Sequence, residues 1–305
     1  MPQCVKCGSE AIEFVRYNGA HLCEEHFLEY VERRVKKELR KEIDLDGKRV
    51  LAVALSGGKD SSVALYIMVQ TLRHRRDLRI CAITVDEGIV GYRPNTLQKA
   101  RQLCQSLEVE HHIISFKEEA GKDMDEIAQA TSNKTPCTYC GVLRRRCLNK
   151  IAREIGADAL ATGLNLDDTA QSILMNFTRA DVERLARLGP HTRIQPGLIP
   201  RLQPLRMIPE KESYLYAMLR GLPFSDEVCP YADRALRNEY REIVDQLEDR
   251  HPGTRFSILA SYDAIKPMLM DAFPPASLRN CECGEPTCNE KCMCCELLEE
   301  VRKMV

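Results

Sequence analysis

The chain has 305 residues, of which 44% are hydrophobic and 29% are charged, and its 44 Lys and Arg against 45 Asp and Glu leave a formal net charge of −1. These values are typical of one main globular domain with smaller appendages, and they exclude a protein that coats nucleic acid through its overall charge. We expect no membrane span, because no run of about 18 apolar residues is present, and a cytoplasmic location, because no basic-then-apolar leader opens the chain.

Four residues of the kinds that bind zinc open the chain in two close pairs, C-x-x-C and C-x-x-H. The chain has 15 cysteines, which stay reduced in a cytoplasmic protein, so their clusters indicate metal or redox sites rather than disulfides. A hairpin-length segment with Asn18-Gly19 as its turn separates the two pairs. This spacing predicts tetrahedral zinc in a knuckle over 1–30 that depends on the metal for much of its stability. The predicted ligands are Cys4, Cys7, Cys23 and His26.

A charged segment over 31–46 is expected to form a linker helix. Its run RRVKKELRK at 33–41 is dense in Lys and Arg, which neutralise phosphates in RNA-binding proteins. Acidic residues are interleaved with the run at Glu32, Glu38 and Glu42. The segment therefore supports two interpretations, an RNA-binding surface and an ordinary solvated helix face.

A short apolar run and a glycine-rich turn follow the charged segment. RVLAVAL at 49–55 is typical of a buried parallel strand, SGGKDSS follows it directly, and VALYIMVQTL at 63–72 has helical spacing. In this arrangement backbone N–H groups and the positive end of a helix dipole meet a phosphate. The spacing differs from GxxxxGK[ST], so a Walker-type NTPase is not indicated. The predicted phosphate-binding residues are Ser56, Gly57, Gly58, Lys59, Ser61 and Ser62.

Three further strand-like segments alternate with helical stretches, at 79–85, 110–116 and 157–163. Alternating strands and helices predict an α/β domain over 47–270 with a doubly wound parallel sheet. Ligands bind such sheets at the carboxyl ends of the strands, where the glycine-rich turn is placed. A proline-containing hinge at 272–277 then leads to the last segment of the chain.

Three cysteines in the interior of the chain have a spacing of their own. Cys137 and Cys140 form a C-x-x-C pair, and Cys229 follows them much later in an expected loop. Three thiolates are one short of a closed zinc site. They suit an iron–sulfur cluster with one open iron, and the pair alone suits a redox-active dithiol. The remaining isolated cysteines are expected in the core: Cys81, Cys104 and Cys147.

The segment over 278–305 holds six cysteines, which is more than one zinc ion requires. We expect a second zinc-binding knuckle there, although Cys288 competes with the other cysteines for a place in it. The favoured ligands are Cys281, Cys283, Cys292 and Cys295.

SGGKDSS matches the PP-loop of adenylating enzymes that release pyrophosphate. Together with the three interior cysteines and the cysteine pairs at both ends, it makes the chain resemble the TtuA/TtcA group of tRNA 2-thiolation enzymes over nearly its full length. The resemblance is greatest to the archaeal and eukaryotic branch with zinc knuckles at both ends. It implies the fold of the PP-loop ATP pyrophosphatases, which is similar to that of the adenine-nucleotide alpha hydrolases. It also implies a tRNA-uridine 2-sulfurtransferase that adenylates the uridine C2 oxygen before sulfur transfer.

The resemblance also implies roles for individual residues. ATP phosphates are expected along the PP-loop from Ala54 through Ser62, including Asp60, and adenine beside Ile83. The nucleotide and Mg²⁺ end is expected at Gly163 and Asp168. The three interior cysteines, Cys137, Cys140 and Cys229, are expected to hold a [4Fe-4S] cluster whose fourth iron is free, with Arg144 as a catalytic basic residue.

Two positions depart from the family pattern. The family usually shows GHN where this chain has Gly163-Leu164-Asn165, and an acidic residue or valine is commoner than Thr169. The missing histidine puts in question any help that the family histidine gives to phosphate chemistry.

The partners implied by the resemblance are tRNA and a sulfur source, either a ubiquitin-like carrier with a C-terminal thiocarboxylate or free sulfide. We also expect a homodimer. Two alternatives remain: a PP-loop enzyme that uses a persulfide on Cys137 or Cys140 without a cluster, for example in cytidine 2-thiolation, and a non-catalytic zinc protein that binds RNA. Besides Arg144–Arg146, arginines expected to face tRNA phosphates are Arg179, Arg184, Arg187, Arg193, Arg201 and Arg206.

Overall fold

The structure is a computed structural model of the whole chain. It describes residues 1–42, 49–130, 134–190, 195, 197–232 and 236–303. The end of the expected linker helix, 43–46, and Arg193 lie outside the described residues.

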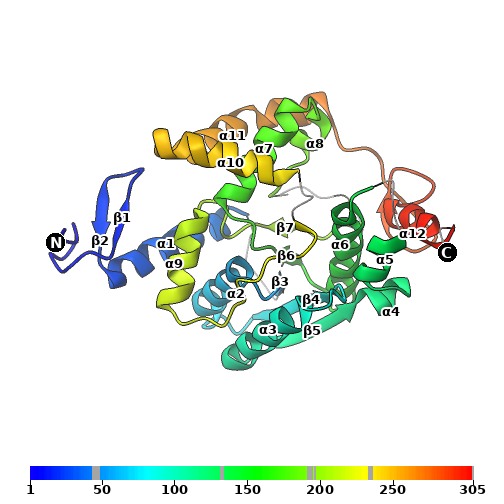
Figure 1. Cartoon of the computed structure of the whole chain (residues 1–305), viewed down its shortest axis with the longest axis horizontal. Helices are drawn as coiled ribbons and strands as arrows, with labels where there is room; N and C mark the ends of the chain where they lie inside the picture. The colour runs from blue at the N-terminus through cyan, green and yellow to red at the C-terminus, as the bar shows by residue number, and fades with distance from the viewer. Residues whose placement is uncertain (43–48, 131–133, 191–194, 196, 233–235, 304–305) are drawn as a thin grey trace.

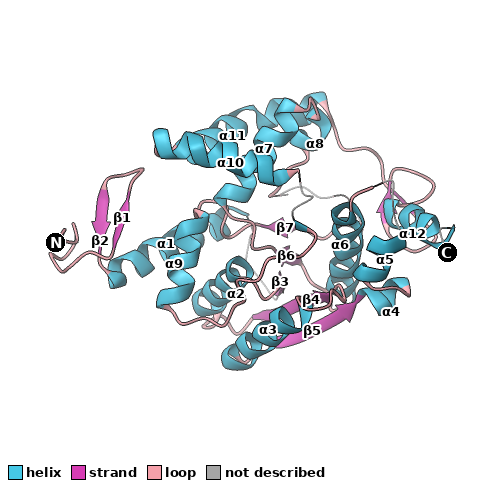
Figure 2. Ribbon diagram, viewed as in Figure 1, coloured by secondary structure: helices cyan, strands magenta, loops and turns pink. Residues whose placement is uncertain are grey.

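A five-stranded parallel sheet forms the centre of the molecule (Figures 1 and 2). Its strands are β3 (Arg49–Ala54), β4 (Leu78–Asp86), β5 (Glu110–Ser115), β6 (Ala159–Ala161) and β7 (Arg201–Leu202). Their order is β5-β4-β3-β6-β7, and every neighbouring pair is parallel. The doubly wound parallel sheet predicted from the sequence is therefore confirmed. The strand order reverses between β3 and β6, which is where such sheets bind ligands.

Helices cover both faces of the sheet. Successive side chains of a strand point to opposite faces, so the apolar residues on each face need a helix to pack against. Leu51 and Val53 belong to the core that β3 shares with α2, whereas Ala52 and Cys81 point to the opposite face and pack with Ala152 of α6. Burial of each large aliphatic side chain contributes about 1.5–3 kcal/mol to stability. The three isolated cysteines are buried, as predicted. The helices flanking the sheet are α2 (Lys59–Leu72), α3 (Arg93–Leu107) and α6 (Pro136–Glu154), and α9 (Glu210–Leu219) packs on α2.

Helix α1 (Glu24–Glu42) is part of the main core and not only a connection. It begins before 31, and its residues Phe27, Val31, Val35 and Leu39 are all buried. Because apolar residues four positions apart lie on one face of a helix, α1 presents one continuous apolar stripe to the domain. Its exposed basic residues are Arg33, Lys37, Arg40 and Lys41.

A group of helices lies beyond the carboxyl ends of the strands, at the top of Figure 1. They are α7 (Leu166–Thr178), α8 (Val182–Ala186), α10 (Arg237–Arg250) and α11 (Thr254–Ala272). Helices α7, α8 and α11 share a small core that includes Ile173, Leu185, Leu259 and Tyr262, and α10 packs against α7 and α11. This layer brings residues from the last third of the described chain next to the strand ends.

The two ends of the chain lie at opposite ends of the long axis of the molecule (Figure 1). The N-terminal segment is a hairpin of β1 (Glu13–Val15) and β2 (Ala20–Leu22), and the C-terminal segment has β8 (Arg279–Asn280), β9 (Pro286–Thr287) and α12 (Met293–Lys303). The C-terminal segment lies beside α6, near α4 (Phe116–Ala120) and α5 (Met124–Ala130) (Figure 1). Among the described residues, none of the helices has both the length and the apolar character of a membrane span.

Candidate nucleotide and thiol site

The glycine-rich turn between β3 and α2 leaves the start of a helix open for an anion. Gly57 has φ +85°, and a Cβ there would lie 2.0 Å from the carbonyl oxygen of Thr96, so a side chain cannot be accommodated. The Ser61 hydroxyl accepts a hydrogen bond from the Ser56 N–H at 3.1 Å and thereby closes the turn. Helix α2 starts with Gly58 at its N-cap, without a side chain that caps it. Its first N–H groups are therefore available to a phosphate.

Lys59 is held at this turn by two carboxylates. Its Nζ lies 2.7 Å from Glu210 Oε1 and 3.1 Å from Asp60 Oδ2. The second carboxylate oxygen of Asp60, Oδ1, is buried and has no hydrogen-bond partner among the described residues. A buried carboxylate oxygen without a partner is costly, and hard cations such as Mg²⁺ prefer oxygen ligands of this kind.

The turn after β6 packs directly against the start of α2. A Cβ at Gly163 would lie 2.7 Å from the backbone nitrogen of Ser61, so only glycine allows this approach. Asn165 then caps α7 by accepting a hydrogen bond from the Asp168 N–H at 2.9 Å. The Asp168 carboxylate lies 3.2 Å from Arg237 Nη1. Burial raises the pKa of Asp168, and the charge of Arg237 opposes that rise.

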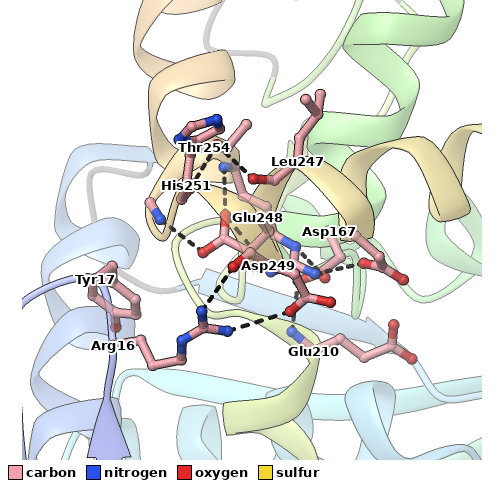
Figure 3. Close-up of polar contacts among 12 residues, drawn as sticks. Arg16, Tyr17, Asp167, Glu210, Leu247, Glu248, Asp249, His251 and Thr254 are labelled. Carbon is pink, nitrogen blue, oxygen red and sulfur yellow. Dashed lines mark hydrogen bonds and ion pairs between the residues drawn. The ribbon is translucent and has the colours of Figure 1, made fainter.

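A second aspartate, Asp167, connects this turn to helices α9 and α11. Its Oδ2 accepts a hydrogen bond from the Glu210 N–H at 2.7 Å, and its Oδ1 lies 2.6 Å from Arg255 Nε. Figure 3 shows this region, in which Glu248 also accepts hydrogen bonds from the N–H groups of Gly253 and Arg255. Burial raises the pKa of Asp167 to about 6, against the charge of Arg255. These ion pairs position Glu210 beside Lys59.

One cavity of about 910 Å³ joins the glycine-rich turn to α6. Arg144 of α6 and Val228, the neighbour of Cys229, also line it. Of the predicted nucleotide residues, those on its walls are Ala54, Ser56, Gly58, Lys59, Asp60, Ser61, Ile83 and Gly163. Those outside its lining are Gly57, Ser62 and Asp168. The cavity therefore has a phosphate end at α2 and a second end next to the interior cysteines.

The three interior cysteines come together at the start of α6. Cys137 and Cys140 lie one turn apart on the helix, and the loop before α10 brings Cys229 to them. The Cys137 thiol donates to the carbonyl oxygen of Tyr231 at 3.5 Å, which ties that loop to the helix. All three thiols are half-buried, but their Sγ atoms do not all lie within 4.8 Å of one another. Burial raises the pKa of Cys140 to about 11, so a metal must displace protons when it binds.

Glu87 connects the thiols to the phosphate end of the cavity. Its buried carboxylate lies 2.8 Å from Arg93 Nε and 3.7 Å from Arg144 Nη1. Arg93 also donates to the carbonyl oxygen of Ser56 at 2.8 Å. The charges of Arg144 and Glu87 both act on Cys140. Glu87 therefore holds two arginines, one against the glycine-rich turn and one beside the thiols.

The N-terminal cluster has the dimensions of a tetrahedral zinc site. Its four predicted ligands offer atoms that all lie within 4.8 Å of one another. The Sγ atoms of Cys7 and Cys23 are 3.7 Å apart, and His26 Nδ1 lies 3.2 Å from Cys23 Sγ and 3.6 Å from Cys4 Sγ. A Zn–S bond of about 2.3 Å places two tetrahedral thiolates about 3.8 Å apart. Because His26 is in the first turn of α1, such a metal would bind the hairpin to this helix.

The C-terminal cluster has the same dimensions with four sulfur atoms. The four favoured cysteines again fall within 4.8 Å of one another. The Sγ atoms are 3.8 Å apart for Cys281 and Cys295 and 3.5 Å apart for Cys283 and Cys292. Backbone N–H groups of Cys283 and Cys292 lower the pKa of Cys281 to about 6, which favours the thiolate that a metal needs. Cys288 is exposed and outside the group.

The N-terminal hairpin docks through Tyr17 and through Arg16, whose contacts with Asp249 are drawn in Figure 3. The Tyr17 hydroxyl donates to Glu212 Oε1 at 2.6 Å and accepts from Arg34 Nη1 at 2.6 Å. The Tyr17 ring packs against Phe256 of α11 with the centroids 4.5 Å apart. Arg16 of the same hairpin donates to the Asp249 carbonyl oxygen at 2.9 Å. The hairpin therefore contacts the helices that also carry the nucleotide-site residues.

The C-terminal segment docks on α6. The Tyr139 hydroxyl donates to Glu300 Oε2 at 3.0 Å, and Arg153 pairs with Glu285. Arg146, which the sequence suggested as a phosphate ligand, instead pairs with Glu119 at 2.8 Å and reaches towards Cys295. The segment thus supports the helix that carries Cys137 and Cys140.

Comparison with known proteins identifies the family. The sequence-family model of the PP-loop domain matches residues 28–247. The sequence-family model of the N-terminal LIM domain of the 2-thiouridine synthetase TtuA matches residues 3–28. The tRNA 2-thiolation protein NcsA of Haloferax volcanii is 37% identical over 98% of this chain and 99% of its own length. The chain belongs to the PP-loop tRNA 2-thiolation family.

Two further members differ in the uridine that their names specify. The tRNA-5-methyluridine(54) 2-sulfurtransferase of Pyrococcus horikoshii is 32% identical over 96% of this chain and 93% of its own length. The solved structure of the U34-tRNA thiolase NcsA from Methanococcus maripaludis with its [4Fe-4S] cluster is 37% identical, with a TM-score of 0.80 over 88% of this chain and 89% of that one. Membership of this family therefore does not identify which tRNA uridine an enzyme modifies.

Leu164 lines the cavity, at the position where members of this family usually have the histidine of GHN. Thr169 is buried, and its hydroxyl donates to the Asn165 carbonyl oxygen at 2.9 Å, so it serves the fold of α7. Sequence reasoning missed Arg93, Arg237 and Arg255, although each contacts a residue of the site. Their positions in the chain form no motif with the PP-loop, so only the fold could reveal them.

Proposed function

We propose that this protein is a tRNA-uridine 2-sulfurtransferase that activates the C2 oxygen with ATP and replaces it with sulfur. The observation that carries the proposal is one cavity with a phosphate-binding turn at one end and residues beside three thiols at the other. Adenylation of O2 and sulfur attack on C2 act on the two atoms of one carbonyl group, so the phosphate-binding turn and the thiols have to share one cavity. The names of the relatives support the tRNA substrate.

The first step proposed for this cavity is adenylation. The uridine O2 attacks the α-phosphorus of ATP, a P–O bond forms, and the bond to pyrophosphate breaks. Lys59 and the first N–H groups of α2 neutralise the charge on the departing pyrophosphate. We propose that Mg²⁺ binds near Asp60 and Asp168, because Asp60 Oδ1 is a buried oxygen without a hydrogen-bond partner among the described residues.

The three interior thiolates are proposed to hold a [4Fe-4S] cluster. Each thiolate of a cluster binds a different iron, so the sulfur atoms lie farther apart than around one zinc ion, as the Sγ atoms here do. When bound, the cluster supplies an iron without a protein ligand, at which a sulfur anion can bind. The persulfide alternative is less well supported, because it gives Cys229 no role.

Arg144 is proposed to act in the second step. Its guanidinium is held by Glu87 and faces the cavity beside Cys140. At that position its charge stabilises an incoming sulfur anion and the negative charge that develops at C2. The C2–S bond forms, the C2–O bond breaks, and AMP leaves with the original uridine oxygen. The sulfur source is proposed to be free sulfide or a carrier thiocarboxylate, which water hydrolyses to a carboxylate as the sulfur is released.

We propose zinc at both terminal clusters, with the eight ligands that the structure groups. Both sites are closed, because four protein ligands leave no position for a substrate, which indicates structural roles. The expected homodimer stays a prediction, which sedimentation velocity measures. A cytoplasmic location is proposed because a relative from Chlamydomonas reinhardtii, 34% identical over 98% of this chain, is a cytoplasmic tRNA 2-thiolation protein.

The function is tested with anaerobically purified, iron-reconstituted protein, unmodified tRNA, ATP–Mg²⁺ and sulfide. The expected product is 2-thiouridine, measured by nucleoside mass spectrometry, with one AMP and one pyrophosphate released for each sulfur incorporated. Fragment mapping of the product tRNA then reads whether position 34 or 54 is modified. No ATP-dependent 2-thiouridine would contradict the proposal, and full activity in iron-free protein would favour the persulfide alternative.

A further inference from the structure

The cavity contains more positive charge than its carboxylates neutralise. Seven basic side chains line it, and in the described part of the chain five of them pair with carboxylates. The two that have no carboxylate within ion-pair distance among the described residues are Arg145 and Arg201. A guanidinium without a carboxylate in a concave site is a ready position for an anion.

The fold holds these two arginines next to each other. Arg145 is on the cavity face of α6, and Asn149, one turn later on the same helix, accepts a hydrogen bond from Arg201 Nη2. Arg201 Nη1 is buried and has no hydrogen-bond partner among the described residues. Burial and the nearby charge of Arg145 lower the pKa of Arg201 to about 10. The charge of Glu285 only partly offsets the repulsion between the two guanidinium groups.

Further arginines extend from Arg145 and Arg201 to the outside of the cavity, and together they form a row. Arg187 lines both the cavity and an adjoining groove of about 730 Å³, which Arg179 and Arg184 also line. The charge of Arg184 acts on Arg145, which indicates that the inner and outer members are neighbours.

The outer arginines keep only weak partners. Arg187 pairs with Glu183 at 2.8 Å and Arg184 with Asp181 at 3.4 Å, in each case at an exposed position. Such surface ion pairs contribute little and exchange readily for a phosphate.

The geometry points to a tRNA phosphate site at Arg145 and Arg201, where the backbone next to the target uridine enters the cavity. A mononucleotide occupies one place, and its phosphates already have Lys59 and the start of α2. A row that leads from the cavity to the surface matches a polyanion whose phosphates recur along a strand. The inference rests on the proposed function for the identity of the RNA.

Other arginines that the sequence suggested as tRNA phosphate ligands differ from these two, because they are paired with carboxylates. Arg206 is buried and paired with Asp263, and Arg146 is paired with Glu119. These pairs stabilise the fold and leave no donor for RNA at the surface. Arg145 is exposed on the cavity side, so its replacement by alanine removes charge without opening the core.

The test measures tRNA binding without ATP, by fluorescence anisotropy over a series of KCl concentrations, for the wild type, Arg145→Ala, Arg201→Ala and the double variant. We expect each single change to weaken tRNA binding about 5- to 10-fold. The slope of log K against log[KCl] should become shallower by about 0.7–0.9 for each lost phosphate contact. Arg76→Ala, an exposed arginine in the turn between α2 and β4, is the matched control and should change neither quantity.

Two results overturn the inference: tRNA affinity and salt slope unchanged in the double variant, or lost ATP affinity with tRNA affinity intact, which assigns the arginines to the nucleotide. Arg145→Lys is a second test of the inference. Because it keeps the positive charge, its tRNA binding should retain most of the wild-type salt slope. Binding is measured without catalysis, so the two proposals fail separately. Protein that binds tRNA as expected but makes no 2-thiouridine contradicts the function and leaves the phosphate site standing.

Discussion

The interior cysteines and the terminal cysteine clusters differ in ligand number, in spacing and in what surrounds them. Each terminal cluster offers four ligand atoms within 4.8 Å of one another, whereas the interior group offers three thiols that are more widely spaced. Residues adjacent to the interior thiols line a cavity that also contains the phosphate-binding turn. A closed set of four ligands stabilises a fold, and an incomplete set beside a cavity leaves room for a reactant. The roles that we propose for the cysteines therefore differ between the two kinds of site.

The two terminal clusters also differ from each other in what they support. The N-terminal hairpin reaches α11 and Glu212 of α9 through Tyr17, near the nucleotide-site residues. The C-terminal segment docks on α6 through Tyr139 and Arg153, behind the interior thiols. We therefore expect damage at the C-terminus to affect sulfur transfer more than damage at the N-terminus.

The largest effect is expected from removing an interior thiol. Cys137→Ala should lower 2-thiouridine formation by about 1,000-fold or more, because the remaining thiolates cannot hold the group that delivers sulfur. The measurement is ATP-dependent thiolation of tRNA under anaerobic conditions. Cys147→Ala is the control on the same helix: this buried thiol has no ligand role, so the change should cost about 1 kcal/mol of stability and leave thiolation intact. Equal activity of the two variants would remove the distinction between interior ligands and core cysteines.

A slightly smaller effect is expected at the phosphate end of the cavity. Lys59→Ala should slow pyrophosphate release by about 100- to 1,000-fold, because the charge that stabilises the leaving group is lost. Affinity for tRNA should stay near the wild-type value. Lys211→Ala, at an exposed position on α9, is the control and should be as active as the wild type. A Lys59→Ala enzyme that thiolates at the wild-type rate would show that the turn does not bind the triphosphate.

A moderate effect is expected from the C-terminal cluster. Cys283→Ser should remove one zinc ion per chain and lower thiolation roughly 10-fold, because α6 loses a packing partner and its thiols are less well positioned. Zinc content is read by elemental analysis, and the iron content should be retained. Cys288→Ser, in the same segment but exposed, should change neither metal. Loss of iron together with zinc would contradict the separation of the two kinds of site.

The smallest effect on activity is expected at the N-terminal contact. Tyr17→Phe removes a hydroxyl that bonds to Glu212 and Arg34, and should lower the free energy of unfolding by about 1–2 kcal/mol. Thiolation at 25 °C should remain within about 2-fold of the wild type, because the nucleotide site keeps its own ion pairs. Denaturant titration measures the first quantity. Tyr214→Phe on α9 is the matched control, and a loss of stability as large as that of Tyr17→Phe would argue against the Tyr17 contact.

The sequence predicted those parts of the molecule in which local pattern and chemistry agree. The strand at 49–55 and the glycine-rich turn after it are specified by residues that are adjacent in the chain. The metal-ligand pairs at the ends are short-range patterns of the same kind, and the structure groups the same eight residues. Strand β7 was not predicted, because two residues carry no periodicity.

The remaining site residues depend on contacts between distant parts of the chain. Arg93 bonds to Glu87 and to the turn at Ser56, and Arg237 reaches Asp168 from a helix 69 positions away. Arginines are frequent on surfaces, so none of these is distinctive in a sequence. Helix α1 shows the opposite case: its charged run suggested a linker, but its apolar stripe, which includes Val31 and Val35, places it in the core.

The central claim is that Cys229 completes a three-thiolate site for iron and sulfur beside the PP-loop. The most direct test compares iron, sulfide and zinc content with ATP-dependent 2-thiouridine formation in the wild type and in Cys229→Ala, both purified and reconstituted anaerobically. The account predicts four iron and two zinc ions per wild-type chain. It also predicts that Cys229→Ala keeps both zinc ions but loses the cluster and the thiolation activity. A Cys229→Ala protein that thiolates tRNA at the wild-type rate, or an iron-free wild type that does so, would contradict it.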